Sequence, residues 1–285
     1  MSLAVLAISG LGVVSDRDAT PILRDISLRV ASGETLGLVG ESGAGKSTIG
    51  KAILGILPRT VRVTSGEIRF EGRDLLTFPA AARRRLIGER VALIPQDPMT
   101  ALNPGRRIEG QLTDGLRLWR GLDAQAARHI ALRLLGEVHI REPERVLGSF
   151  PHQLSGGMRQ RVLIAAAFAL EPALIVADEP TTALDVTVQK QILRLIRNMQ
   201  HAHGTAVIFV SHDLGVVAQI CDHVTLLYAG RIVEQGATAE MLEAPKHAYT
   251  RALIEACPRY DRPDAGLRPV PEEILAQLRA EAAAP

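Results

Sequence analysis

The sequence predicts an α/β fold in which a mainly parallel β-sheet is covered by helices on both faces. Short apolar runs of strand length alternate with helical stretches over most of the 285 residues. That alternation is typical of parallel sheets, because a crossover helix must connect successive strands. Between residues 98 and 160 the strand pattern stops and helical patterns dominate, which predicts a helical subdomain inserted into this core.

The first half of the chain alternates strands with turns and one helix. The strands expected here are Ile26–Val30, Thr35–Val39, Glu67–Phe70 and Val91–Ile94. The first alternates apolar and polar residues, as a half-buried strand does, whereas the last is wholly apolar and ends at a proline. A Gly-rich segment follows the second strand and leads into a helix that ends before Pro58.

The second half of the chain returns to the same alternation after the helical subdomain. The expected strands are Ala173–Ala177, Ala206–Val210 and Val224–Tyr228, and the expected helices include Met158–Leu170 and Val186–His201. Within the helical subdomain itself, a helix is expected at Ala124–Val138. A hairpin is expected over residues 228–233. From Gly236 onward the sequence is rich in proline, and one last helix is expected at Glu272–Ala283.

The composition excludes several classes of protein. The net charge of +2 is not concentrated as in a nucleic-acid-binding surface, and the run Arg83–Arg85 is interpreted as a solvated helix face. The two cysteines, Cys221 and Cys257, lack the spacing of a metal or redox site, which favours a reducing compartment. No signal peptide or membrane span is expected, because no apolar run approaches about 18 residues. A soluble chain that works at a membrane would do so through partners.

A phosphate-binding loop is the strongest motif in the sequence. Residues 40–47 match the pattern G-x-x-x-x-G-K-[ST] without a mismatch, directly after a predicted strand and before a predicted helix. Glycines allow consecutive backbone N–H groups to approach phosphate oxygens, and the helix N-terminus adds positive potential. The predicted nucleotide-binding residues are Gly40, Glu41, Ser42, Gly43, Ala44, Gly45, Lys46, Ser47 and Thr48. Lys46 is expected to reach the β- and γ-phosphates, and the hydroxyl of Ser47 to ligate Mg²⁺.

Two adjacent carboxylates follow the apolar strand that ends at Ala177. Asp178 and Glu179 fall where the carboxyl ends of parallel strands meet a ligand crevice. Such a strand can deliver one carboxylate to Mg²⁺, so Asp178 is the candidate Mg²⁺ ligand. Glu179 is then the candidate general base that polarises an attacking water. Without the phosphate loop, an exposed acidic turn would be an equally good interpretation.

The segment Leu154–Arg161, with the sequence LSGGMRQR, resembles the signature of ABC ATPases. The other elements of that family follow in family order from about Ala4 to Ala256. They are Gln96 for the Q-loop, Ala183–Asp185 for the D-loop and His212 for the switch histidine. The resemblance implies a P-loop, RecA-like ABC ATPase core with an antiparallel β subdomain and an inserted α-helical subdomain. It divides the chain into an ATPase domain, 1–255, with the helical subdomain at about 98–160, and a C-terminal extension, 256–285.

The resemblance also assigns roles within the site. Glu179, His212 and Gln96 are expected to be catalytic, with Ser47, Gln96 and Asp178 as ligands of Mg²⁺ beside ATP. Ser155, Gly156 and Gly157 are expected to close over the nucleotide of a partner cassette, with Asp185 in the D-loop. In isolation, that segment would be interpreted as an ordinary serine N-cap. Because each ATP would need residues of two chains, the resemblance implies that a monomer hydrolyses ATP poorly.

Four further motifs are similar to those of ATPases that serve bacterial oligopeptide, dipeptide and nickel importers. They are Gln96–Pro104, Pro151–Gln153, Glu179–Val186 and Pro245–Leu253. The similarity implies an ATPase that powers uptake of peptides, with nickel or another small solute as the alternative cargo. A distant alternative is an ABC ATPase that acts on DNA or ribosomes.

The implied partners follow from the same resemblance. They are a second cassette, expected to be a related but distinct chain, two membrane permeases and, indirectly, an extracytoplasmic binding protein, with no nucleic acid. The implied location is the cytoplasmic face of the bacterial inner membrane, held there peripherally. The cargo and the choice between homodimer and heterodimer stay open, because a cassette does not contact the cargo.

Two features depart from the family pattern. The family usually stacks an early aromatic residue on adenine, but Ser15 stands near that position and the first aromatic residue is Phe70. Such stacking contributes about 0.5–1.5 kcal/mol beyond area burial, so weaker discrimination of adenine is expected. Several members also hold an Fe–S cluster on C-terminal cysteines. This tail has only Cys257, so such a cluster is not expected.

Overall fold

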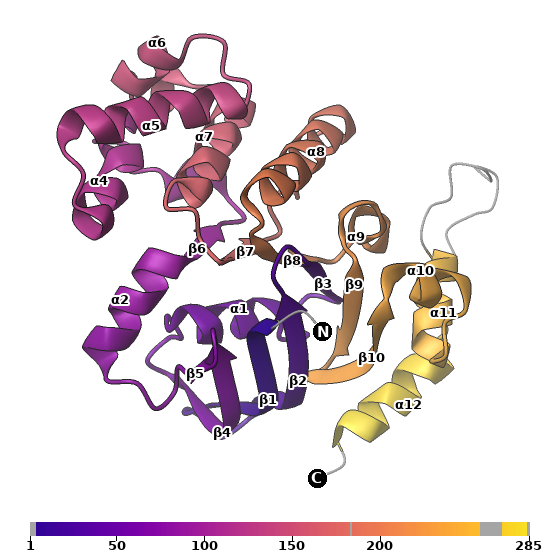
Figure 1. Cartoon of the computed structure of the whole chain (residues 1–285). Helices are drawn as coiled ribbons and strands as arrows, with labels where there is room; N and C mark the ends of the chain where they lie inside the picture. The colour runs from indigo at the N-terminus through magenta and orange to yellow at the C-terminus, as the bar shows by residue number, and fades with distance from the viewer. Residues whose placement is uncertain (1–3, 183, 257–269, 284–285) are drawn as a thin grey trace. The chain divides into compact units, whose positions relative to one another are not determined.

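The computed structural model describes residues 4–182, 184–256 and 270–283, and Cys257 and Ala183 lie outside these ranges. The chain divides into two compact units (Figure 1). The first unit comprises residues 1–78 and 208–285, and the second comprises residues 79–207. Among the described residues, no helix combines the length and apolar character that a membrane crossing requires. The division at residues 255 and 256 that the sequence predicts stays a prediction.

The first unit contains an antiparallel sheet of four strands in the order β2-β1-β4-β5. The strands are β1 (Ala4–Ser15), β2 (Pro21–Ala31), β4 (Val61–Phe70) and β5 (Arg73–Asp74). Strand β1 pairs with both β2 and β4, so it lies in the middle of the sheet. A tight turn follows β4, and Glu71 and Gly72 both adopt the positive φ that it requires.

The first unit also carries strands of a second sheet, in which β3 lies beside β9 and β8. Its elements are β3 (Thr35–Gly40), α1 (Lys46–Leu54), β8 (Ala206–Ser211), α9 (Leu214–Ile220), β9 (His223–Tyr228), β10 (Arg231–Ala237), α10 (Thr238–Glu243), α11 (Ala248–Ala256) and α12 (Glu272–Ala283). Strand β8 begins in the second unit and passes into the first at Ile208. Strands β3 and β9 are parallel, and β9 forms the predicted hairpin with β10. Every residue of β3 is buried, which explains why the strand is apolar after Thr35.

The second unit consists mostly of helices. Its elements are α2 (Ala80–Arg90), β6 (Val91–Ile94), α3 (Pro98–Ala101), α4 (Ile108–Arg120), α5 (Ala124–Glu137), α6 (Pro143–Gly148), α7 (Gly156–Phe168), β7 (Leu174–Asp178) and α8 (Val186–His203). Strands β6 and β7 are parallel and pair from Val91 with Leu174 to Ile94 with Ala177. The carboxyl ends of both strands therefore lie at the same edge.

The structure confirms the α/β class and most predicted elements, but the tail after Gly236 was predicted wrongly. Helices α10 and α11 lie where only irregular, proline-rich sequence was expected. Both are short, and α11 follows Pro245 closely, so the prolines bound the helices instead of excluding them. Helix α11 buries Tyr249, Thr250 and Ala252, so contacts with the rest of the unit support a helix too short to form alone.

Candidate functional site

The loop between β3 and α1 is shaped by close backbone contacts. A Cβ atom on Gly40 would lie 2.2 Å from the carbonyl oxygen of Leu227, and one on Gly45 would lie 2.5 Å from Cδ2 of Leu23. Gly45 also has a φ of 97°, which side-chain-bearing residues rarely adopt. The two pattern glycines are therefore required by this geometry, as the sequence motif predicts.

Further hydrogen bonds close the loop on itself. The Nζ of Lys46 donates to the carbonyl oxygens of Gly40, at 2.7 Å, and Glu41, at 2.9 Å. The carbonyl oxygen of Ala44 accepts from the N–H of Gly230 at 3.2 Å. Lys46 is only 5% exposed, so its ammonium group lies within the loop at the N-terminus of α1. An ammonium group and a helix N-terminus at one place favour an anionic ligand.

His212 lies in the same unit and follows the carboxyl end of β8, the strand next to β3. Its neighbours form a local turn in which the N–H of Asp213 donates to Oγ of Ser211 at 3.0 Å. Asp213 then caps α9 by accepting from Gly215 and Val216. The side chain of His212 is exposed at the end of this strand, which suits contact with a ligand.

In the second unit, Glu179 follows β7 and is held by two side chains. Its Oε2 accepts from Oγ1 of Thr182 at 3.0 Å and from Nε2 of Gln96 at 3.4 Å. Gln96 follows β6, and the parallel pairing of β6 with β7 brings these predicted residues together. Asp178 is the last residue of β7.

The backbone at Glu179 is unusual, because its φ is 46°. A residue other than glycine in this left-handed region costs of order 1–3 kcal/mol, and such residues cluster at functional sites. Thr182 donates its backbone N–H to the carbonyl oxygen of Glu179, so a tight turn holds this conformation. Glu179 therefore combines a strained backbone with a side-chain carboxylate that Thr182 and Gln96 hold in one direction.

Gln160 is a positioning residue that the sequence motifs did not single out by role. Its Nε2 donates to the carbonyl oxygen of Pro180 at 2.8 Å, and the side chain is only 1% exposed. This bond connects α7 to the turn immediately after Glu179. The only signal in the sequence was a polar residue between two arginines, shortly before the apolar run that begins at Val162.

The predicted signature residues begin α7. Ser155 is its N-cap, and its Oγ accepts from the N–H of Met158 at 3.3 Å. Within the described part of the chain, no atom outside the local backbone lies within 4 Å of a Cβ placed on Gly156, so the helix start is open. Asp185 caps α8 in the same way, by accepting from Thr187 and Val188.

The predicted site residues thus form two groups, one in each unit. Residues 40–48 and His212 belong to the first, and Gln96, residues 155–157, Asp178, Glu179 and Asp185 belong to the second. Among these, the structure brings Gln96 and Glu179 into contact and closes Lys46 onto its own loop. Their roles stay predictions.

The donor set suits Mg²⁺. Ser47, Gln96 and Asp178 offer a hydroxyl, an amide oxygen and a carboxylate, which are the hard oxygen ligands that Mg²⁺ prefers. Among the described residues, no group of three or more His, Cys, Asp or Glu side chains could hold a metal ion. Few protein carboxylates are typical of Mg²⁺ that is bound largely through phosphates and water.

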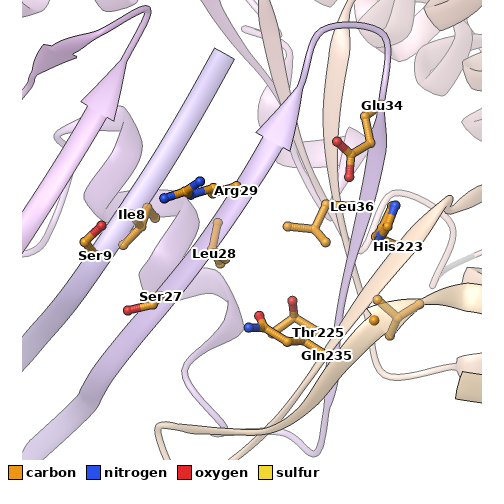
Figure 2. A pocket seen from close by; sticks show the side chains of 12 residues that line it. Ile8, Ser9, Ser27, Leu28, Arg29, Glu34, Leu36, His223, Thr225 and Gln235 are labelled. Carbon is orange, nitrogen blue, oxygen red and sulfur yellow. The ribbon is translucent and has the colours of Figure 1, made fainter. Parts of the chain in front are cut away.

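A separate cavity lies away from the predicted residues. It has a volume of about 360 Å³ and is lined by segments of β1, β2, β3, β9 and β10 (Figure 2). Figure 2 shows Arg29, Glu34 and His223 among the side chains around it. None of the residues in the predicted site lines this cavity.

The fold, the closed phosphate loop and the paired carboxylate and amide define an ATPase cassette of the P-loop class. Residues 23–182 match the model of the ABC transporter family, and residues 233–282 match that of the oligopeptide/dipeptide transporter C-terminal region. The chain belongs to the ABC transporter family. This confirms the resemblance, the fold class and the ATPase activity that the sequence predicts.

Several relatives are similar over most of the chain. A probable peptide ABC transporter ATP-binding protein, y4tR of Sinorhizobium fredii, is 47% identical over 244 residues, which is 85% of this chain and 73% of that protein. The probable D,D-dipeptide transport ATP-binding protein DdpD of Escherichia coli is 47% identical over 88% of this chain and 77% of its own length. The dipeptide transport ATP-binding protein DppD of Haemophilus influenzae is 44% identical over 90% and 79%.

Solved structures support the same fold. CbiO1 of Clostridium perfringens, part of the ABC transporter complex cbiONQ, superposes with a TM-score of 0.74 at 26% identity, over 85% of this chain and 91% of that one. The ATP-binding cassette MJ0796, a dimer bound to ADP and phosphate in a post-hydrolysis state, superposes with a TM-score of 0.72 at 25% identity. That match covers 82% of this chain and 98% of the other.

Proposed function

We propose that the chain is the ATP-hydrolysing subunit of a bacterial importer of dipeptides or oligopeptides. One observation carries the proposal: an ABC transporter match over residues 23–182 and an oligopeptide/dipeptide transporter C-terminal match over residues 233–282 occur in a single chain. The names of the similar relatives, which are peptide, D,D-dipeptide and dipeptide transport ATP-binding proteins, support the same cargo class.

In this proposal, the loop of residues 40–48 binds the triphosphate of ATP. The ammonium group of Lys46 leaves the carbonyl oxygens that it now contacts and donates to the β- and γ-phosphates. Ser47, Gln96 and Asp178 would hold Mg²⁺, which neutralises charge on the phosphates when it is bound. The buried position of Lys46 makes its attraction for phosphate stronger than it would be in water.

The hydrolysis step uses the carboxylate of Glu179. Glu179 accepts a proton from the attacking water as the water oxygen bonds to the γ-phosphorus. The bond between the γ-phosphorus and the bridging oxygen breaks, and ADP and inorganic phosphate leave. Hydrogen bonds from Thr182 and Gln96 fix the direction of this carboxylate. His212 donates a hydrogen bond to the γ-phosphate, where negative charge is spread over three oxygens.

The proposal includes the partners that the family resemblance implies. Ser155, Gly156 and Gly157 close over ATP bound to a second cassette, and the Asp185 region lies near that partner. The open start of α7 supports this, because a partner's phosphate can approach it without displacing side chains. Two permeases hold the cassette pair at the cytoplasmic face of the inner membrane. Gln96 lies at the start of the helical subdomain, so ATP binding there would move this subdomain against the permeases.

An uptake assay tests the function. A strain that lacks this chain is complemented with the wild type, Glu179→Gln or Glu171→Gln, and uptake of labelled dipeptide, oligopeptide and nickel is compared. Peptide uptake should return with the wild type and Glu171→Gln and fall by about 10²–10⁴-fold with Glu179→Gln. Glu171 is a matched control, because it also has a positive φ, of 49°, but pairs with Arg120 on the surface. Uptake of nickel alone would replace the peptide proposal with its alternative.

A further inference from the structure

Helix α11 contacts the phosphate loop through one buried side chain. The hydroxyl of Tyr249 donates to Oε1 of Glu41 at 3.3 Å, across 208 residues of sequence. Tyr249 is 0% exposed, whereas Glu41 lies on the exposed side of the loop. Burial, and next the charge of Glu41, raise the pKa of Tyr249, so the hydroxyl keeps its proton and serves as the donor.

The position of Tyr249 is fixed by Glu234, an acidic residue in the middle of strand β10. Glu234 accepts from the backbone N–H of Lys246 at 2.9 Å and of His247 at 3.0 Å, and from the hydroxyl of Thr250. Burial raises the pKa of Glu234, but these hydrogen bonds outweigh it and hold the pKa below its ordinary value. A charged Glu234 therefore anchors the first turn of α11, which carries Tyr249.

A second aromatic ring completes the support. The ring of Tyr228, at the end of β9, meets that of Tyr249 edge to face, with centroids 5.3 Å apart. Gly230, two residues after Tyr228, donates its N–H to the carbonyl oxygen of Ala44 in the phosphate loop. The hairpin and α11 thus hold the loop at two points, one through backbone at Ala44 and one through a side chain at Glu41.

We propose that Tyr249 is a positioning residue for ATP binding: by holding Glu41, it keeps the phosphate loop in the shape that accepts the triphosphate. The main chain of Glu41 also accepts from Lys46, so the residue that Tyr249 holds is the one from which the ammonium group must move. A loop that is held before the ligand arrives loses less conformational freedom on binding. This inference rests on the proposed assignment of residues 40–48 as the phosphate site.

The test is equilibrium titration of the full chain with a fluorescent ATP analogue and Mg²⁺. Glu41 lies on the exposed side of the loop, so water screens its hydrogen bond with Tyr249, which should contribute about 0.5–1.5 kcal/mol. Tyr249→Phe should therefore raise the dissociation constant about three- to tenfold. Tyr228→Phe is the matched control, because it removes a hydroxyl that hydrogen-bonds Arg279 and keeps the ring against Tyr249. Its dissociation constant for ATP should stay within about twofold of the wild type, which is the range expected for a change that does not affect the site.

A double-mutant cycle separates positioning from a general loss of stability. In a Glu41→Ala background the acceptor is gone, so Tyr249→Phe should change the ATP dissociation constant less than about twofold. An equal effect in both backgrounds would overturn the inference, because Tyr249 would then act without Glu41. If Tyr249→Phe does not fold, the ATP dissociation constants of Glu41→Gln and Glu41→Ala are compared instead. Both variants remove the charge, but only Glu41→Ala removes the acceptor, so Glu41→Ala should have the larger dissociation constant. Equal dissociation constants would overturn the inference. Absence of ATP binding by the wild type would instead overturn the proposed function.

Discussion

Helices α1 and α7 both begin at glycine-rich sequence, but their N-termini are built in different ways. Helix α1 begins after Gly45, which adopts a left-handed conformation and offers no side-chain cap. Helix α7 begins after Ser155, whose hydroxyl caps the helix in an extended conformation. A Cβ atom on Gly45 would collide with Leu23, whereas one on Gly156 would meet nothing within 4 Å.

Under the proposed function, this difference would let two glycine-rich helix starts serve as two kinds of anion site. Around α1, the loop is packed against β2 and the β9–β10 hairpin and closes on Lys46. Such a loop suits a ligand that the chain itself holds. Around α7, the helix start is open and contributes only backbone and one hydroxyl. Such a surface suits a ligand that a second molecule presents. Three predictions test this contrast, and a fourth concerns the base of the nucleotide.

The largest expected effect is that of Lys46→Ala on the closed loop. Removal of the ammonium group should weaken ATP binding on the order of a hundredfold or more, because charge-assisted contacts to phosphate are the strong ones. Equilibrium titration of the purified chain measures the change. Lys51→Ala, on an exposed position of the same helix, should bind ATP as the wild type does. Equal loss in both variants would show that bulk charge, not the loop, holds the ligand.

Replacement of one glycine by alanine at the start of each helix should have different effects on stability and ATP binding. Gly45→Ala forces a left-handed φ and a contact with Leu23, so it should lower the free energy of unfolding by about 1–3 kcal/mol and weaken ATP binding about tenfold. Gly156→Ala should leave ATP binding to the isolated chain unchanged and lower ATPase activity only in the assembled cassette pair. Thermal unfolding and titration are measured together. Loss of ATP binding in the isolated Gly156→Ala chain would contradict the contrast.

Removal of the cap of α7 should cost stability but not nucleotide affinity. Ser155→Ala loses the bond to the N–H of Met158, and such N-caps contribute about 1 kcal/mol. The melting temperature should fall by about 2–4 °C for a chain of this size, with an unchanged dissociation constant for ATP. Ser155→Asp, which retains a cap, should melt as the wild type does. A parallel fall in affinity would mean that Ser155 serves the nucleotide of its own chain.

The smallest expected effect concerns the base of the nucleotide. Phe70, the first aromatic residue of the chain, is fully buried, so it offers no exposed face to adenine. The absence of early stacking should limit the preference for ATP over GTP, because such contacts contribute about 0.5–1.5 kcal/mol. Competition titration gives the ratio of the two affinities. A preference of about a hundredfold or more would sink this expectation.

The fold was predictable wherever its elements had a strong period or strong boundaries. Val91–Ile94 and Glu272–Ala283 have the predicted bounds. A proline follows the first, and two acidic residues stand in the first turn of the second. The pattern of strand β1 gave no clear strand signal, because its pairing with β2 and β4 shifts register at several points and breaks the alternation of period two. Helices α10 and α11 were missed because packing, not propensity, supports such short helices.

The candidate site was predictable where one residue type has one chemical use. The glycines and Lys46 follow from the phosphate motif, and the contact of Gln96 with Glu179 follows from two parallel strands that end at one edge. The contact of Tyr249 with Glu41 was beyond prediction, because 208 residues separate them and neither type specifies the other. Gln160 was equally hidden, since only burial distinguishes it from an exposed glutamine.

The left-handed backbone at Glu179 also affects which substitutions evolution and protein engineering would favour at this position. Glycine adopts a φ of 46° without steric cost, so Glu179→Gly relieves strain at the same position where it removes the proposed base. A screen for thermostable variants would therefore enrich inactive chains at this codon. Selection for uptake must continually act against that drift, and a stability-guided consensus design should leave this position untouched.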